Sequence, residues 1–173
     1  MTTHTLELRP ALDPDRDGPL IEQLADLLID ATDSGGSVGF LPPLDRADAI
    51  AFWRDLALRP RGAFVIARAG DQVDGVVLLC PSWAPNQAHR ADISKLLVHQ
   101  RARGAGLGRR LMEAVTDHAR AQGFGLLVLD TKRDDTADRL YRRLGWSVAG
   151  VIPDYAIYGD GYCDTVVFYL RLA

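Results

Sequence analysis

The residues with the clearest chemical potential lie in the segment Arg101-Ala102-Arg103-Gly104-Ala105-Gly106-Leu107-Gly108-Arg109-Arg110. Its alternating glycines lack a Cβ, so the backbone can approach a ligand closely. The segment joins a β-rich run to a helical pattern, so the free N–H groups of the first helical turn favour an anion in the loop. Because four arginines add positive charge around it, the expected ligand is a diphosphate.

Other known diphosphate loops fit these residues less well. The phosphate loop of nucleoside triphosphatases needs Gly-Lys followed by Ser or Thr, whereas Gly108 is followed by Arg109 and Arg110, which excludes that loop. The dinucleotide-binding fingerprint GxGxxG differs in spacing, although Asp130 lies about where a ribose-binding acid would be. The dinucleotide alternative therefore stays open, as does an ordinary glycine-rich surface turn.

The loop resembles the coenzyme A pyrophosphate loop of the GCN5-related N-acetyltransferase (GNAT) family, whose signature is Q/R-x-x-G-x-G/A. The signature fits in two frames, one starting at Arg101 and one at Arg103. The frame from Arg103 is preferred because it leads directly into the helix. A second segment, Asp134-x-x-Ala137-x-x-x-Tyr141-x-x-Leu144-Gly145-Trp146, is similar to the family's N-x-x-A-x-x-x-Y-x-x-x-G-F, with Asp134 in place of the usual Asn. The chain is identified as a member of this family.

Within the family the chain looks closest to the tabtoxin-resistance acetyltransferases, which acetylate a small antibiotic-like amine. The matching residues lie at 35–40, 95–98, 129–131 and 150–155. The resemblance implies acetyl-CoA as cofactor, with its pantetheine arm paired to the backbone of one strand and its pyrophosphate in the glycine loop. The cofactor-binding residues it implies are Leu96, Leu97, Val98, Arg103, Gly104, Ala105, Gly106, Leu107, Gly108, Arg109, Asp134, Ala137 and Tyr141.

Acetyl transfer to an amine requires a proton for the leaving thiolate and a base for the attacking ammonium. Tyr141 is the predicted acid, because a phenol with a pKa near 10 can protonate a thiolate. Asp130, at the end of an apolar run, is the first candidate to hold or deprotonate the amine, with Asp92 and His89 as alternatives. Neither cysteine has the setting of a nucleophile, so the amine is expected to attack the thioester directly.

The acceptor pocket is expected to have aromatic walls with acidic neighbours, which suits a small cationic amine. The residues predicted to line it are Gly36, Phe40, Trp53, Trp83, Asp130 and Tyr155. The same residue types would suit a lysine or N-terminal amine of a protein, so a protein acetyltransferase remains an alternative. A further alternative is a module that binds acyl-CoA without catalysis. The presence of Tyr141 counts against this alternative, because such a module needs no acid.

These residues require a scaffold of alternating strands and helices. β-Rich runs lie at 5–9, 64–68, 73–80, 91–98, 126–130, 146–151 and 163–172. Helical patterns begin near residues 20, 45, 107 and 135. The order predicts an α/β (α+β) fold: a mixed, mostly antiparallel sheet of about seven strands flanked by about four helices, in one domain spanning residues 1–173. The apolar run Leu126–Asp130 predicts a strand buried on both faces.

Composition excludes several other classes of protein. The net charge of −3 argues against a nucleic-acid partner. No apolar run approaches the roughly 20 residues of a membrane span, and residues 1–10 have no hydrophobic signal core. The two cysteines, Cys80 and Cys163, lie in no metal-binding or disulfide pattern. These features predict a cytoplasmic protein without a metal, either a monomer or a homodimer, and the resemblance implies a small-molecule amine as its partner.

Overall fold

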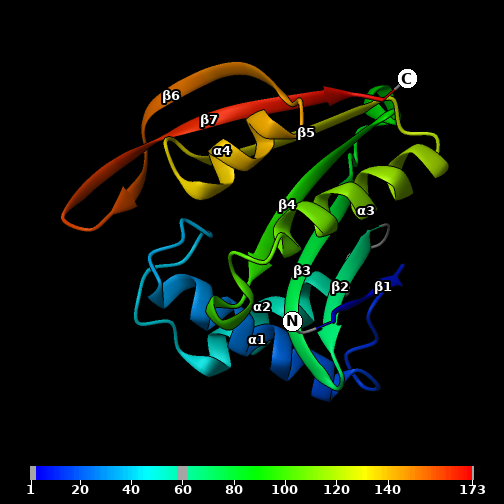
Figure 1. Ribbon diagram of the computed structural model, residues 1–173, viewed down its shortest axis with the longest axis vertical. Coiled ribbons are helices and arrows are strands. Elements are labelled where there is room, and N and C mark those ends of the chain that lie inside the picture. The colour runs from blue at the N-terminus through cyan, green and yellow to red at the C-terminus, as the bar shows by residue number, and fades with distance from the viewer. Residues whose placement is uncertain (1–2, 58–61, 173) are drawn as a thin grey trace.

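The computed structural model describes residues 3–57 and 62–172, and within them seven strands form one sheet flanked by four α-helices (Figure 1). The strand order is β1-β2-β3-β4-β5-β7-β6, and every neighbouring pair is antiparallel except β4 and β5. The predicted fold class is thereby confirmed. The strands are β1 (Thr5–Arg9), β2 (Ala63–Ala69), β3 (Gln72–Pro81), β4 (Arg90–Val98), β5 (Leu126–Lys132), β6 (Ser147–Tyr158) and β7 (Gly161–Arg171). The helices are α1 (Gly18–Asp33), α2 (Arg46–Ala57), α3 (Leu107–Ala121) and α4 (Thr136–Arg143).

Two apolar cores hold the helices against opposite faces of the sheet. Helices α1 and α2 share one core with alternate residues of β2 and β3, such as Phe64 and Val76. Helices α3 and α4 share the other core with the intervening residues of the same two strands, such as Val65 of β2 and Val77 of β3. Apolar side chains recur at helical spacing in α3, so Leu107, Leu111 and Val115 all lie buried on its inner side.

The two parallel strands, β4 and β5, diverge soon after they begin. They pair only where Arg90–Asp92 lie beside Leu126–Val128. Beyond that point no register joins them, so the β5-facing edge of residues 93–98 keeps backbone groups that strand pairing does not satisfy. This divergence opens the sheet between its two halves.

A β-bulge lies in β4 within the divergent part. Val76 of β3 pairs with Leu97 and Leu78 pairs with Ser94, so two residues of β4 oppose one of β3. Lys95, one of these two, has a φ of 50°, in the left-handed region that non-glycine residues seldom adopt. Bulges of this kind re-aim side chains and are frequent beside active sites.

Two expectations about the later strands are wrong. The strand β5 is not buried on both faces: Leu127 and Leu129 are buried but Asp130 is exposed, because the face opposite α3 and α4 opens where the strands diverge. Strand β6 continues past residue 151 to Tyr158, since a register shift between Ile152 and Ala156 absorbs the proline in that stretch. The β6–β7 hairpin therefore extends beyond the body of the sheet (Figure 1).

Candidate active site

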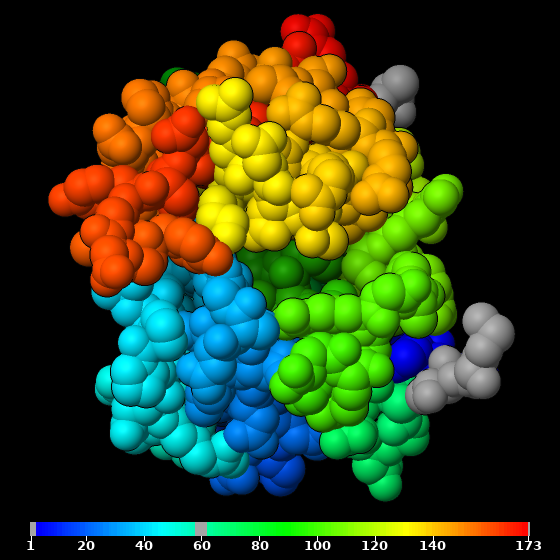
Figure 2. Space-filling view, turned by 60° about the vertical axis from the view of Figure 1, so that its left-hand side comes forward, coloured from blue at the N-terminus to red at the C-terminus, as the bar shows by residue number. Residues whose placement is uncertain are grey.

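A cleft of about 830 Å³ occupies the opening between β4 and β5. Figure 2 shows it as a hollow below the yellow and orange surface of β5, α4 and the β6–β7 hairpin, and above the blue and green surface of α1 and the glycine loop. Its walls come from the α1–α2 loop, the second half of β4, the glycine loop, the end of β5, α4 and the hairpin. Segments far apart in the sequence thus meet around one space.

The glycine loop forms one end of this cleft. Gly104 and Gly106 have φ angles of 78° and 76°, which favour glycine, and a Cβ on either would meet nothing within 4 Å. Helix α3 begins directly after Gly106 without a side-chain cap and without an acidic residue in its first turn. Its first turn instead carries Arg109 and Arg110, which the helix dipole disfavours unless an anion binds there.

The two left-handed glycines match the signature frame that starts at Arg101, not the preferred frame from Arg103. Gly108, the third glycine, lies within α3, where a Cβ would come 3.5 Å from Leu140 of α4. A Cβ at this distance makes an ordinary van der Waals contact, so only Gly104 and Gly106, with their left-handed backbone, shape the loop as glycines.

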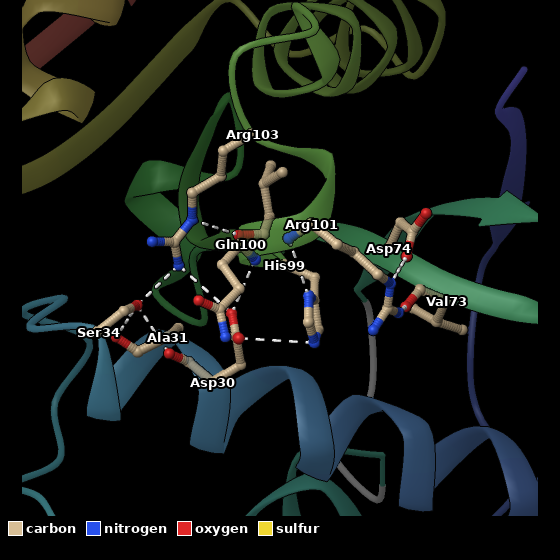
Figure 3. A network of polar contacts seen from close by, with 10 residues as sticks. Asp30, Ala31, Ser34, Val73, Asp74, His99, Gln100, Arg101 and Arg103 are labelled. Carbon is tan, nitrogen blue, oxygen red and sulfur yellow. Dashed lines mark hydrogen bonds and ion pairs between the residues drawn. The ribbon is translucent and has the colours of Figure 1, made fainter. Parts of the chain in front are cut away.

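The four arginines of the loop have different partners, and Figure 3 shows those of Arg101 and Arg103. Arg101 turns away from the cleft and donates to Asp74 at 2.6 Å. Arg110 donates to the carbonyl of residue 4. Arg103 and Arg109 line the cleft, where Arg103 donates to Ser34 Oγ at 2.8 Å and Arg109 pairs with its neighbour Glu113. Two of the four charges are thus placed to meet an anion.

Two aspartates anchor the chain that leads into the loop (Figure 3). Asp30 of α1 accepts from the backbone N–H of Gln100 at 3.0 Å, and Asp74 of β3 binds Arg101 and lies 2.7 Å from His4 Nε2. Asp74 is 4% exposed. Burial acts to raise the pKa of its carboxyl, but the hydrogen bonds from His4 and Arg101 outweigh burial and hold this pKa below its usual range.

Replacing Asp74 by Asn should reduce the free energy of unfolding at pH 7 by about 2 kcal/mol, since two charge-assisted bonds are weakened. A carboxyl whose pKa is lower in the folded than in the unfolded protein stabilises the folded state at pH values above its unfolded-state pKa of about 4. This stabilisation is lost as the pH falls from there through the folded-state pKa. Urea unfolding from pH 7 downward should therefore show the two proteins converging below about pH 4. The exposed Asp71→Asn is the control. A difference that is constant with pH would contradict this ion pair.

Helix α4 brings Tyr141 to the cleft. Its ring is 5% exposed and packs edge-on against Phe168, with centroids 5.8 Å apart, and against Trp146. Burial, followed by the nearby carboxylates of Asp130 and Asp135, raises the pKa of the phenol well above its usual range. Tyr141 is therefore a protonated donor at neutral pH, and a weaker acid than an ordinary phenol.

The three candidate bases lie in different places. Asp130 is exposed on the cleft wall and accepts a hydrogen bond from Thr165 Oγ1 at 3.2 Å. Asp92 does not line the cleft and pairs with Arg90 at 2.8 Å; burial and then the charge of Asp130 raise its pKa. His89 is exposed and also lies outside the cleft. Only Asp130 among these three faces the opening.

Several residues predicted for the site lie elsewhere. Trp53 is fully buried in the core of α1 and α2, Trp83 is 93% exposed on a loop, and Phe40 packs on Phe52, so none of these aromatic rings forms a wall of the cleft. The side chain of Asp134 is 87% exposed and points away, because its backbone makes a left-handed turn before α4. Ala105 likewise does not line the cleft, whereas the other predicted residues line it: Gly36, Leu96, Leu97, Val98, Gly104, Leu107, Ala137 and Tyr155, with those described above.

Three cationic residues line the cleft that sequence reasoning did not assign: Lys95, Lys132 and Arg143. Lys132 lies over the ring of Tyr158, 3.8 Å from its centroid, and 3.5 Å from Asp135. The sequence offered one indication for Lys95, because a charged residue is unusual within an apolar strand. Only the β-bulge shows that its side chain is directed into the cleft.

A model of the acetyltransferase (GNAT) family matches residues 21–146, more than half of the chain. The chain belongs to the GNAT family. This GNAT protein is 33% identical over 135 residues to the L-methionine sulfoximine/L-methionine sulfone acetyltransferase of Pseudomonas aeruginosa, covering 75% of this chain and 76% of that one. It resembles a solved GCN5-related N-acetyltransferase from Kribbella flavida (TM-score 0.76, 26% identity, 96% and 98% covered). A Salmonella typhimurium protein solved with its cofactor acetyl-CoA has the same fold (TM-score 0.74, 19% identity, 98% and 95% covered).

Membership makes this chain an N-acetyltransferase and favours the coenzyme A loop over the dinucleotide alternative. These relatives support the GNAT family and not the narrower tabtoxin-resistance type. None of the GNAT helices in the described ranges is long and apolar enough to cross a membrane. Within the same ranges, no three His, Cys, Asp or Glu side chains are grouped to hold a metal ion.

Proposed function

We propose that this GNAT protein transfers the acetyl group of acetyl-CoA to a small-molecule amine, which attacks the thioester directly. The observation that carries the proposal is one continuous cleft lined by the glycine loop, the unpaired edge of β4, Tyr141 and Asp130. An anion site, an extended backbone edge, a proton donor and a carboxylate are the groups that this reaction needs.

The donor half of the site runs along β4. The backbone N–H groups of the loop at 104–108 and the start of α3 would hold the pyrophosphate, with Arg103 and Arg109 beside it. Leu96, Leu97 and Val98 line the cleft on the edge that β5 leaves unpaired, so the amide groups of the pantetheine arm would pair there like an added strand. A backbone N–H near Val98 would polarise the thioester carbonyl.

The acceptor half contains Asp130 and Tyr141. The amine, after losing a proton to Asp130 or through water, attacks the carbonyl carbon; the N–C bond forms and the C–S bond breaks. Tyr141 donates a hydrogen bond and a proton to the departing sulfur. Two relatives named as acetyltransferases of small molecules support a small acceptor: the methionine sulfoximine enzyme and an IAA acetyltransferase of Azospirillum brasilense (32% identity over 99 residues).

Titration calorimetry with acetyl-CoA, followed by release of free thiol in the presence of an amine panel, tests this function. We expect saturable binding and thiol release that depends on a small amine. Binding without release by any amine would indicate an acyl-CoA-binding module. Release with peptide lysines or peptide N-termini alone would indicate a protein acetyltransferase. Absence of heat and of a thermal shift at millimolar acetyl-CoA would overturn the proposal.

A further inference from the structure

Lys95 is a cation at the acceptor end of the cleft with no assigned role. Its backbone lies in the β4 bulge, and its side chain is half-buried and lines the cleft. Nζ donates to the carbonyl oxygen of Val38 at 2.9 Å and lies 5.2 Å from the centroid of Phe52. The bulge thus holds an ammonium against the α1–α2 loop.

The hydrogen-bond partner of Lys95 is a neutral carbonyl, whereas three of the four other cations that line the cleft have a carboxylate partner. Arg103, Arg109 and Lys132 each pair with a carboxylate within 4 Å. Arg143 also donates to a carbonyl, but it is exposed, so water solvates its charge. Burial lowers the pKa of Lys95, which shows that the surroundings disfavour its charge. An ammonium in this setting gains from an anion that enters the cleft.

Asp130 supplies the opposite charge in the same cleft. Asp130 acts to raise the pKa of Lys95, but the larger effect of burial leaves this pKa lowered. Both residues line the cleft, and among the described residues no ion pair within 4 Å joins their side chains. The two opposite charges therefore line the same cleft and attract each other without direct contact between their side chains. A ligand that carries both a cationic amine and an anionic group would satisfy both of them.

We propose, as an extension of the proposed function on which this inference depends, that Lys95 selects acceptors that carry a carboxylate close to the amine. The acceptor amine lies toward Asp130 and its carboxylate binds Lys95 Nζ. The acceptor is then an amino acid or a compound of that type. Lys95 is a specificity-determining residue, because it contacts the acceptor away from the bond that forms.

The test compares acceptors that differ only in the carboxylate. Wild-type protein is assayed by thiol release with L-methionine sulfone and the common amino acids, each beside its decarboxylated amine. A charge-assisted hydrogen bond corresponds to roughly a tenfold to hundredfold effect, so kcat/KM should favour the acids by at least about tenfold. The difference should lie mainly in KM, since the carboxylate is bound in both ground and transition states.

Two variants isolate the charge. Lys95→Met keeps most of the length of the side chain without its charge and should reduce the preference for acids at least about tenfold, while Lys95→Arg should retain much of it. The acetyl-CoA affinity of each variant serves as the control for folding. If Lys95→Met does not fold, the wild-type comparison and Lys95→Arg decide.

The possible results distinguish a failure of this inference from a failure of the proposed acetyltransferase function. Equal or better acetylation of the decarboxylated amines by wild type would overturn it, as would an acid preference unchanged in Lys95→Met. If acetyl-CoA binds but no acid in the panel is acetylated, the acceptor class is wrong while the donor site stands. If acetyl-CoA does not bind, the proposed function itself fails and this inference fails with it.

Discussion

Tyr141→Phe should lower kcat about a hundredfold and change the KM for acetyl-CoA by less than about threefold, because the variant removes only the proton donor. General acids contribute between about a hundredfold and ten-thousandfold, and the raised pKa of this buried phenol places it at the lower end. The packing on Phe168 and Trp146 involves the ring and not the hydroxyl, so the melting temperature should change little. Steady-state kinetics of thiol release and thermal unfolding measure both effects.

Tyr169→Phe makes the same chemical change in β7, outside the cleft, and serves as the control for Tyr141→Phe. It should retain the kcat of wild type. Because the phenol of Tyr141 remains protonated up to at least about pH 10, its titration should cause no loss of kcat below that pH. A Tyr141→Phe variant with the kcat of wild type would show that this residue only packs against its neighbours.

Gly106→Leu should weaken acetyl-CoA binding at least tenfold, since its side chain would enter the space that the pyrophosphate is proposed to occupy. The substitution also costs about 1–2 kcal/mol of stability, because Gly106 has a left-handed backbone. Calorimetric titration measures the affinity, and urea unfolding measures the stability.

The chain offers a matched control for Gly106→Leu at the other end of the same helix. Gly123 has a φ of 81° and, like Gly106, nothing within 4 Å of an added Cβ, but it does not line the cleft. Gly123→Leu should therefore have a similar stability cost of about 1–2 kcal/mol and the acetyl-CoA affinity of wild type. If both variants lose affinity equally, backbone strain explains the loss and the loop is not the anion site.

Much of this site was predictable because its requirements are local. A left-handed turn needs glycine, and an anion at the start of a helix needs free N–H groups, so the glycine loop could be located from its residues. Spacing admitted two frames, and only the backbone angles of Gly104 and Gly106 distinguish them. The helical period likewise placed Tyr141 on the inner side of α4, where it is buried. Both features depend on a few consecutive residues.

The aromatic residues were harder to assign, because an aromatic side chain suits a core as well as a pocket wall. Trp53 and Trp83 were both predicted to line the pocket, and yet one is in the core and the other is in solvent. Asp92 and Asp130 are both carboxylates in strands, but Asp92 pairs with Arg90, two residues before it in β4, whereas Asp130 lies on the cleft wall. Burial in the core and a position on the cleft wall depend on neighbours distant in sequence.

By itself the sequence determined the order of the elements, the position of the glycine loop before α3 and the burial of Tyr141, since each follows from local residue preferences or from periodicity. Tertiary structure decided where β4 and β5 part, which charges face the opening and how Lys95 is aimed at it. The physical reason is that these properties arise from pairing between strands far apart in the chain. A shift of one residue in that pairing reverses the face on which a side chain lies.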